Sequence, residues 1–153
     1  MIVYRLSKGL YKNDLSGRGA ELVGGRWNSR GTALLYTCES RALCTTEIAV
    51  HTPLGIVPVD YWLIRLEVPD ELLLSEVLAE DLPEDWRSFP HPNATQLIGD
   101  AFVRDGRFVG MKVPSAVVHG DYNFLFNPRH PDFHQVKLLD SEPFPFDVRL
   151  FMR

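Results

Sequence analysis

The sequence predicts a single α+β domain with mixed or antiparallel strands and two or three helices. Strand-like segments outnumber helical ones, they do not alternate with helices as in repeated βαβ units, and no linker or internal repeat divides the chain. The 153 residues, of which 45% are hydrophobic and 24% charged, suffice for one domain with a sizeable core and are too few for two ordinary domains. We therefore expect residues 1–153 to fold as one unit.

The N-terminal third predicts a strand, a loop, a second strand and a helix. Residues 2–6 are short, β-branched and alternating, as in a strand, and residues 7–25 hold five glycines among polar side chains, as in a functional loop. The extended apolar run 32–37 predicts the second strand. Ser40 can cap a helix that the breaker cluster at 51–55 ends.

The middle of the chain is regular at first and then ambiguous. Residues 60–68 alternate in polarity and predict a strand, which Pro69 closes. Residues 70–92 are less regular. Within them, 72–78 fits either a short strand or a helical turn, and 81–86 has the proline of a turn that leads into a short helix.

A second helix and four strands are expected after this region. Asn93 and Gln96 have the spacing of a capping box, apolar residues then recur at helical intervals, and Gly106 supplies a left-handed stop. The remaining segments that are β-branched or alternating are expected to be strands: 109–113, 116–119, 135–139 and 146–151.

Charge and hydropathy argue against two classes of protein. The formal net charge is −4 and no block of basic residues stands out, so direct nucleic-acid binding is not expected. The apolar runs fall far short of the ~20 residues of a membrane span, and the first residues lack the layout of a signal peptide, so we expect a cytoplasmic protein without membrane contact. Cys38 and Cys44 fit neither a disulfide framework nor a usual zinc spacing, and we expect them to be reduced packing residues.

Two familiar site patterns are incomplete in this chain. His130 and His134 are four positions apart, but a proline between them interrupts the helix that would bring both to one metal ion, so no metal site is expected. Ser115, His119 and Asp121 are the residue types of a nucleophile triad, yet the nucleophile elbow that accompanies such a serine is missing.

The helix that begins after Ser40 places a carboxylate on an apolar face. With a period of 3.6 residues, Leu43, Thr46, Glu47 and Val50 share one face, which should meet the core. A carboxylate in such surroundings is costly unless it is paired or used. Glu47 is therefore either the structural partner of an arginine or a working acid group.

A series of short stretches along nearly the full chain has the residues and order of a known family. The stretches are Tyr4-Arg5, Gly25-Arg26-Trp27-Asn28, Gly31, Leu35-Tyr36, Ala42-Leu43, Glu47, Val113-Pro114-Ser115-Ala116, Asn123-Phe124-Leu125-Phe126-Asn127-Pro128 and Phe146-Asp147-Val148-Arg149-Leu150. Their ordered combination resembles the RES domain, the toxin half of bacterial toxin–antitoxin pairs that destroy NAD. Cys44 and Thr45 stand where small or aliphatic residues are expected, a departure that touches no catalytic position.

This resemblance implies a RES-type domain over residues 1–153, with a fold like that of ADP-ribosyltransferase toxins. It also implies cleavage of NAD at the nicotinamide–ribose bond by phosphate or water, which depletes cellular NAD. NAD and, for phosphorolysis, inorganic phosphate would be substrates, and no cofactor is implied. The catalytic positions would be Arg26, Tyr36, Glu47 and Ser115. The positions that bind substrate would be Arg5, Arg26, Tyr36, Asn123 and Asn127.

The same resemblance implies two kinds of protein partner. One is a cognate antitoxin of the Xre helix-turn-helix family, which would block the cleft and make any DNA contact itself. The other is a further copy of the toxin, because such toxins commonly self-associate.

The chemistry gives each catalytic position a role. Glu47 would stabilise the sugar cation that forms as nicotinamide leaves and would orient the nucleophile. Arg26 would bind a phosphate of the pyrophosphate through its planar donors. Tyr36 would stack on the nicotinamide ring and hold a ribose or phosphate through its hydroxyl. Ser115 would fix Glu47 or the substrate in place.

Each of these residues also has a structural interpretation, and two other functions stay open. Arg26 and Glu47 can form a buried ion pair, Tyr36 can be a strand core residue, and Ser115 can cap the turn after Pro114. One alternative function is transfer of ADP-ribose to a protein. The other is a non-catalytic binding module in which the pair of Arg26 and Glu47 is architectural.

Overall fold

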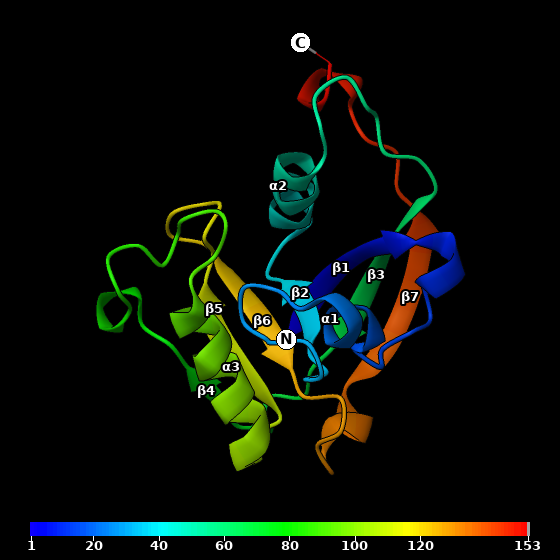
Figure 1. Ribbon diagram of the computed structural model, residues 1–153. Coiled ribbons are helices and arrows are strands. Elements are labelled where there is room, and N and C mark those ends of the chain that lie inside the picture. Colours follow the sequence, from blue (N-terminus) through cyan, green and yellow to red (C-terminus); the bar gives the residue numbers. More distant parts are fainter. Residues whose placement is uncertain (153) are drawn as a thin grey trace.

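The computed structural model of the protein describes residues 1–152 and places seven strands in one sheet, with three α-helices around it (Figure 1). The strands are β1 (Ile2–Lys8), β2 (Leu35–Cys38), β3 (Tyr61–Glu67), β4 (Leu74–Glu76), β5 (Gly110–Pro114), β6 (Tyr122–Phe126) and β7 (Lys137–Pro143). The helices are α1 (Arg18–Val23), α2 (Arg41–His51) and α3 (Asn93–Asp105). The predicted α+β class and the mixed, mainly antiparallel sheet are confirmed.

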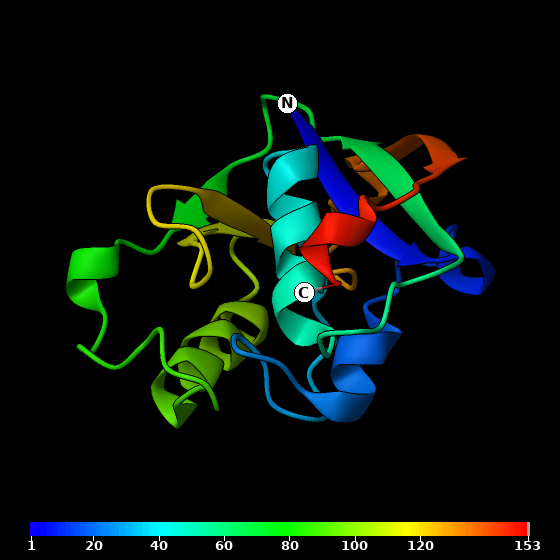
Figure 2. The same ribbon diagram turned by 90° about the horizontal axis from the view of Figure 1, so that it is seen from above.

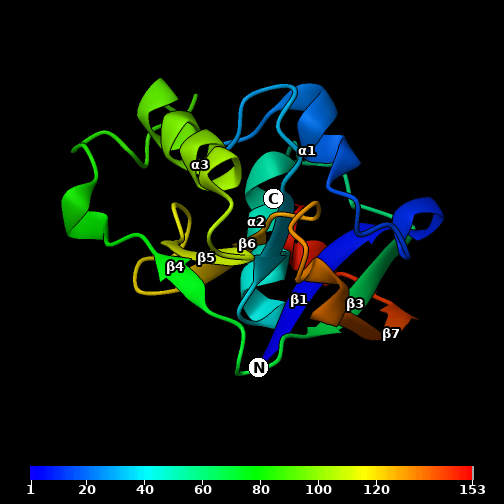
Figure 3. The same cartoon turned by 90° about the horizontal axis from the view of Figure 1, so that it is seen from below.

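The sheet opens near its middle. The strand order is β4-β5-β6-β2-β1-β3-β7, and only β4 and β5 run parallel. β1 pairs with β3 over seven register positions but with β2 only at Tyr4 and Cys38. As a result, β1, β3 and β7 lean away from β4, β5 and β6 in Figure 1, with β2 between the two halves. Figure 3, from below, shows α1 and α3 on the same side of this sheet.

Three hydrophobic clusters hold these elements together. The first joins strands of both halves: Val3, Leu35, Ile64, Leu66, Val68, Phe124, Phe126 and Val136. The second lies beneath α3: Trp27, Leu34, Trp86, Met111, Val113 and Leu125. The third attaches α2 to β2: Cys38, Leu43 and Cys44. Because alternate residues of a strand face opposite ways, Leu35 packs in the first cluster and Tyr36 against the second.

Helix α2 begins and ends where the sequence predicts. The Ser40 Oγ accepts a hydrogen bond from the Leu43 backbone N–H at 3.1 Å, and Thr52 returns to extended backbone after His51. Both cysteines are free and buried, as expected of packing residues. Val50 was predicted to face the core and is instead 55% exposed, because the end of α2 rises beyond the strands (Figure 1).

Helix α3 is also confirmed, although its predicted capping box is wrong. The helix ends at Gly106, which adopts the left-handed conformation that glycine tolerates best. Pro92 occupies the cap position, and the Thr95 hydroxyl donates to the Pro92 carbonyl at 3.1 Å. Gln96 is therefore free to reach another part of the chain. None of the helices within residues 1–152 has the length and apolar composition that a membrane crossing requires.

Three predicted elements are wrong, each because a local turn prevails. Residues 116–119 are not a strand, since the Ser115 Oγ accepts from the backbone N–H groups of Val117 and Val118 at 3.1 and 3.0 Å. Residues 146–151 are not the final strand, because Val148–Leu150 form a 3-10 turn capped by Asp147. Residues 81–86 contain turns and no α-helix.

Two elements escaped prediction. α1 lies inside the region expected to be a loop and is only six residues long, so its helical periodicity is too short to detect. β6 is a continuous run of mostly aromatic and apolar side chains with no alternation, because it is buried between β5 and β2. β7 begins at Lys137, two positions after its predicted start, and extends to Pro143.

The packing of α3 fixes the turn formed by residues 25–28, which carries Arg26. A side chain at Gly99 would place its Cβ 1.5 Å from the Trp27 carbonyl oxygen, so helix and turn are in direct backbone contact. One turn earlier on α3, the Gln96 side-chain amide donates to the carbonyls of Gly25 and Asn28 at 3.0 and 3.1 Å. The helix thus holds turn 25–28 by shape and by hydrogen bonds.

Gly99→Ala is expected to lower the free energy of unfolding by about 3 kcal/mol or more, because α3 must move away from turn 25–28. Gly19→Ala in α1 is the matched control. No atom lies within 4 Å of the added Cβ there, and alanine favours a helix by up to about 1 kcal/mol. Urea unfolding of both variants measures the difference. Equal stabilities would contradict the close packing at Gly99.

Candidate active site

A cavity of about 790 Å³ lies where β1 and β2 separate. Its walls come from both strands, α2, turn 25–28 and the segment formed by residues 86–91. In Figure 2, α2 crosses the centre of the molecule, with the green segment after β4 to one side and α1 to the other. The volume is in the range of sites for small molecules and cofactors. Five of the predicted site residues line it: Arg5, Arg26, Tyr36, Glu47 and Asn123.

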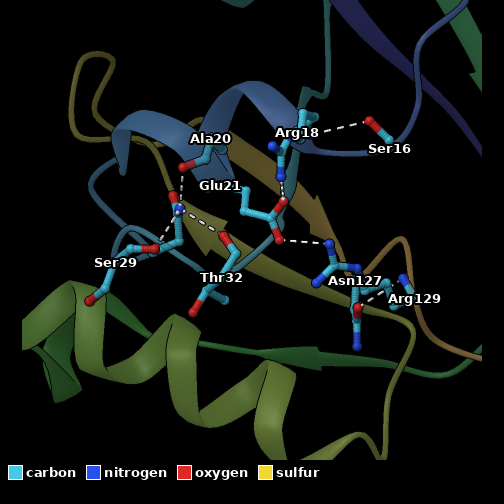
Figure 4. Close-up of polar contacts among 9 residues, drawn as sticks. Ser16, Arg18, Ala20, Glu21, Ser29, Thr32, Asn127 and Arg129 are labelled. Carbon is cyan, nitrogen blue, oxygen red and sulfur yellow. Dashed lines mark hydrogen bonds and ion pairs between the residues drawn. The ribbon is translucent and has the colours of Figure 1, made fainter.

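Turn 25–28 is held by a fully buried amide. The Asn28 Nδ2 donates to the carbonyls of Ala20, Thr32 and Ser29 at 2.8, 3.0 and 3.2 Å, and its Oδ1 accepts from the Tyr36 hydroxyl at 2.6 Å. Figure 4 shows the residues of the three accepting carbonyls, Ala20, Ser29 and Thr32, close to one another. One side chain therefore joins α1, the turn and β2.

Glu21 of helix α1 forms two ion pairs, one within the helix and one with Arg129, which follows β6. The Glu21 carboxylate accepts from Arg18 Nη1 and from Arg129 Nη2, each at 2.6 Å, and Figure 4 shows each guanidinium group facing one of its two oxygens. Hydrogen bonds from Arg18 and Arg129 lower the pKa of Glu21 despite its burial. Asn127 accepts from the Arg129 backbone N–H at 3.0 Å and does not line the cavity, so the structure places it in a turn.

Arg26 lines the cavity, and one nitrogen of its guanidinium group is hydrogen-bonded to the protein itself. Its Nη1 donates to the carbonyls of Trp86 and Ser88 at 2.6 and 3.1 Å. Burial lowers the pKa of Arg26, while Glu47 raises it. Within residues 1–152 no ion pair joins Arg26 to Glu47, so the architectural pair considered from the sequence is not formed.

Tyr36 contributes its ring to the cavity wall and its hydroxyl to the turn. The hydroxyl donates to the Asn28 Oδ1 and accepts from the Trp27 backbone N–H at 3.1 Å. Burial raises the pKa of Tyr36, so this hydroxyl stays protonated as a donor. A Cβ at Gly25 would lie 2.7 Å from it, which explains the glycine at that position. These two hydrogen bonds make the Tyr36 hydroxyl a support of the turn, and its contact with ribose or phosphate stays a prediction.

Ser115 and Glu47 meet although 68 positions separate them. The Ser115 hydroxyl, fully buried behind the cavity wall, donates to the Glu47 Oε1 at 3.4 Å while it caps the turn after β5. Both sequence interpretations of Ser115, as a turn cap and as a support for Glu47, therefore hold. The carboxylate is thus presented to the cavity by α2 and oriented from behind.

The protonation of Glu47 is set by opposing influences. Burial raises the pKa of the carboxyl, and His51, Ser115, Asn123 and Arg26 each lower it. The net effect is a raised pKa, so the ionised form is destabilised in the folded protein. A carboxylate of this kind gains from any positive charge that develops beside it.

Sequence reasoning missed the residues of segment 86–91 that line the cavity: Arg87, Phe89 and His91. They lie in the stretch that was too irregular to assign. The one available signal was an arginine between two aromatic side chains, Trp86 and Phe89, in a region without periodicity. Within residues 1–152 no three potential metal-ligating side chains gather in one place.

Tyr36→Phe is expected to lower the free energy of unfolding by about 1–3 kcal/mol, because it leaves the Asn28 Oδ1 and the Trp27 N–H without their partner. Tyr11→Phe is the control, since that side chain is 53% exposed, and we expect a change within about 0.5 kcal/mol. Urea unfolding of both variants measures this. Equal effects of the two substitutions would show that the Tyr36 hydroxyl does not hold the turn.

Glu47→Gln is expected to be at least as stable as the unaltered protein at pH 8. Because the folded state raises the pKa of Glu47, this group adds stability below its ordinary pKa and loses it as the pH rises through the raised value. The glutamine variant avoids that loss, so the difference in Tm between this variant and the unaltered protein should shrink as the pH falls. Thermal unfolding from pH 4.5 to 8 measures it, with Glu71→Gln on the surface as control. A glutamine variant that is less stable at every pH would restore the structural interpretation of Glu47.

Comparison with known proteins gives a consistent result. The chain matches the model of the RES domain over residues 2–147. It is 36% identical over 143 residues to the "Prs ADP-ribosylating toxin" of Sphingobium sp. (strain YBL2), covering 92% of this chain and 89% of that protein. It is 35% identical over 153 residues to "Toxin Res" of Yersinia enterocolitica, covering 98% and 99%. A chain of the crystal structure of the M. tuberculosis MbcT–MbcA toxin–antitoxin complex has the same fold, with a TM-score of 0.76, 23% identity and coverage of 98% and 86%.

Proposed function

The chain belongs to the RES domain family, and from that premise we propose that it is the toxin of a toxin–antitoxin pair that cleaves NAD at the nicotinamide–ribose bond. The observation that carries this proposal is a single carboxylate, Glu47, in a cavity that also presents Arg5, Arg26 and Arg87. The carboxylate can stabilise a positive charge on the ribose, and the arginines can bind the negatively charged phosphates. This arrangement matches the charges of a dinucleotide. The cavity volume of about 790 Å³ suits a ligand of that class.

Cleavage at this bond needs little proton transfer. The electron pair of the C–N bond leaves with the pyridine, which is cationic in NAD and departs neutral, so no general acid is required. The ribose carbon that loses this pair becomes an oxocarbenium ion. Glu47, ionised and held by Ser115, stabilises that cation at close range in a largely buried site. Burial makes the ionised carboxylate poorly solvated, so the developing charge gives it a partner.

The nucleophile then attacks the opposite face of the sugar. Inorganic phosphate would give a phosphorylated ADP-ribose, and water would give free ADP-ribose. In both cases Glu47 can orient the nucleophile, and with water it can accept the proton. No cofactor takes part in this scheme, because NAD is itself the substrate.

The biological setting follows from the same family membership. Relatives bear the name Toxin Res, and a solved structure that shares this fold is a toxin–antitoxin complex. We therefore extend the proposal to a cytoplasmic toxin that self-associates and is blocked by an antitoxin of the Xre helix-turn-helix type. NAD depletion would arrest growth when the antitoxin is absent.

A second candidate function is supported by one specific observation. The Sphingobium relative is named a Prs ADP-ribosylating toxin, and ADP-ribosylation is the transfer of ADP-ribose to an acceptor. The same oxocarbenium ion can be captured by a protein side chain in place of phosphate or water. The two functions share Glu47 and differ only in the acceptor.

Purified protein incubated with NAD is expected to release nicotinamide, and product analysis with and without inorganic phosphate identifies the acceptor. Glu47→Gln should lose activity by about 100-fold or more, the scale of removing a central electrostatic group. The acidic limb of the rate profile should lie above the usual glutamate range, because the pKa of Glu47 is raised and the ionised form is needed. Mass spectrometry of products and a pH–rate profile measure these effects.

Controls separate the competing functions. Labelled NAD added to cell extract gives labelled small molecules if cleavage is the function and a labelled macromolecule if transfer is. Glu71→Gln, exposed and outside the cavity, should retain full activity. A folded Glu47→Gln variant that still consumes NAD at the normal rate would refute the proposal.

A further inference from the structure

Three buried nitrogen atoms in the described part of the chain have no hydrogen-bond partner, and all belong to residues that line the cavity. They are Arg5 Nε, Arg87 Nε and His91 Nδ1. Buried polar atoms are nearly always paired, since leaving one unpaired costs free energy. These three side chains gather around one cavity, where the protein's own groups supply no partner for these nitrogens.

Charge points to an anionic ligand. The cavity is lined by three guanidinium groups, Arg5, Arg26 and Arg87, and by one carboxylate, Glu47, although the whole chain has a net charge of −4. Within residues 1–152, neither Arg5 nor Arg87 takes part in an ion pair. Arg87 lies with its guanidinium 4.5 Å from the centre of the Trp86 ring, which leaves its donors available.

The position of Arg87 is set by turn 25–28. Arg26 donates to the carbonyls of Trp86 and Ser88, the two neighbours of Arg87 in the chain. Trp27 packs on Trp86, with ring centres 6.3 Å apart. Consecutive residues of the turn therefore contact the backbone carbonyls on both sides of Arg87 and the Trp86 ring, which fixes the first part of segment 86–91.

We propose that Arg87 binds the diphosphate of the dinucleotide substrate, with Arg5 as a second cation in the same cavity, and that Arg26 acts as the positioning residue for Arg87. This inference rests on the proposed function and names its phosphate subsite. The planar donors of a guanidinium match phosphate oxygens in pairs. Phosphate binding, the role that the sequence predicted for Arg26, is thereby assigned in part to Arg87, which the sequence did not single out.

A phosphate oxyanion can reach this site from two sources, the substrate diphosphate or free inorganic phosphate. Titration calorimetry with four probes distinguishes them: ADP-ribose, ADP, adenosine and inorganic phosphate. Arg87→Ala is expected to weaken ADP-ribose and ADP by about 10- to 100-fold and to leave adenosine unchanged, as for loss of a charge-assisted hydrogen bond. Arg87→Lys, which keeps the charge but not the planar pair, should fall between.

Arg107→Ala is the matched control. Arg107 is exposed, lies outside the cavity and rests on the Phe108 ring at 5.3 Å, much as Arg87 rests on Trp86. Its removal deletes the same charge and the same kind of ring contact, so it should change neither ADP binding nor nicotinamide release. Thermal unfolding of each variant verifies that it is folded.

The part played by Arg26 has its own test. Arg26→Ala alone should weaken ADP binding. The same substitution should cause little further loss of ADP affinity in the Arg87→Ala variant, because Arg26 acts through Arg87. Fully additive losses would overturn the positioning role and give Arg26 its own phosphate contact.

The outcomes are separable from those of the proposed function. ADP affinity unchanged by Arg87→Ala, or adenosine weakened as much as ADP, would overturn the subsite. An effect on inorganic phosphate alone would assign Arg87 to the acceptor and overturn the assignment to the substrate. Protein that binds ADP through Arg87 but releases no nicotinamide from NAD would support the subsite and overturn the proposed function.

Discussion

The buried side-chain amide of Asn28 is the constraint on which the site depends. Its nitrogen donates to three backbone carbonyls, and its oxygen accepts a hydrogen bond from the Tyr36 hydroxyl. An amide can satisfy both kinds of partner at once, which neither a carboxylate nor a lysine can do. Without it, several buried polar groups would lose their partners together, and such networks fail as units. Turn 25–28 would then no longer present Arg26 to the cavity.

The charge arrangement of the cavity follows from this scaffold. Burial disfavours the ionised form of Glu47 and the charged forms of Arg5 and Arg26, as the directions of their pKa shifts indicate. The protein does not relieve this by pairing Arg26 with Glu47, which would neutralise both. Keeping them apart leaves each charge available to a ligand, a condition that favours binding and charge stabilisation over stability of the empty protein.

Local signals in the sequence were sufficient for α2 and for the placement of Glu47. Ser40, the apolar spacing and the breaker cluster all lie within one stretch, so no distant contact is needed to interpret them. The contact between Ser115 and Glu47 joins β5 to α2, and only the ordered resemblance to a family suggested it. Arg87 left no comparable signal, because its position depends on hydrogen bonds from Arg26, about 60 positions away. Asn28 was noticed as part of a motif, but its role is visible only where α1, turn 25–28 and β2 meet.

A division of labour explains why several named positions are structural. In the proposed cleavage of NAD the pyridine departs neutral and requires no acid, so a single carboxylate suffices. That carboxylate must be held within a fraction of an ångström, and Ser115 does so from behind. Tyr36 and Asn28 fix turn 25–28, the turn fixes segment 86–91, and that segment brings Arg87 to the cavity. Loss of Tyr36 or Asn28 would therefore displace charges that neither residue carries, so a residue can be indispensable to such a site without touching the substrate.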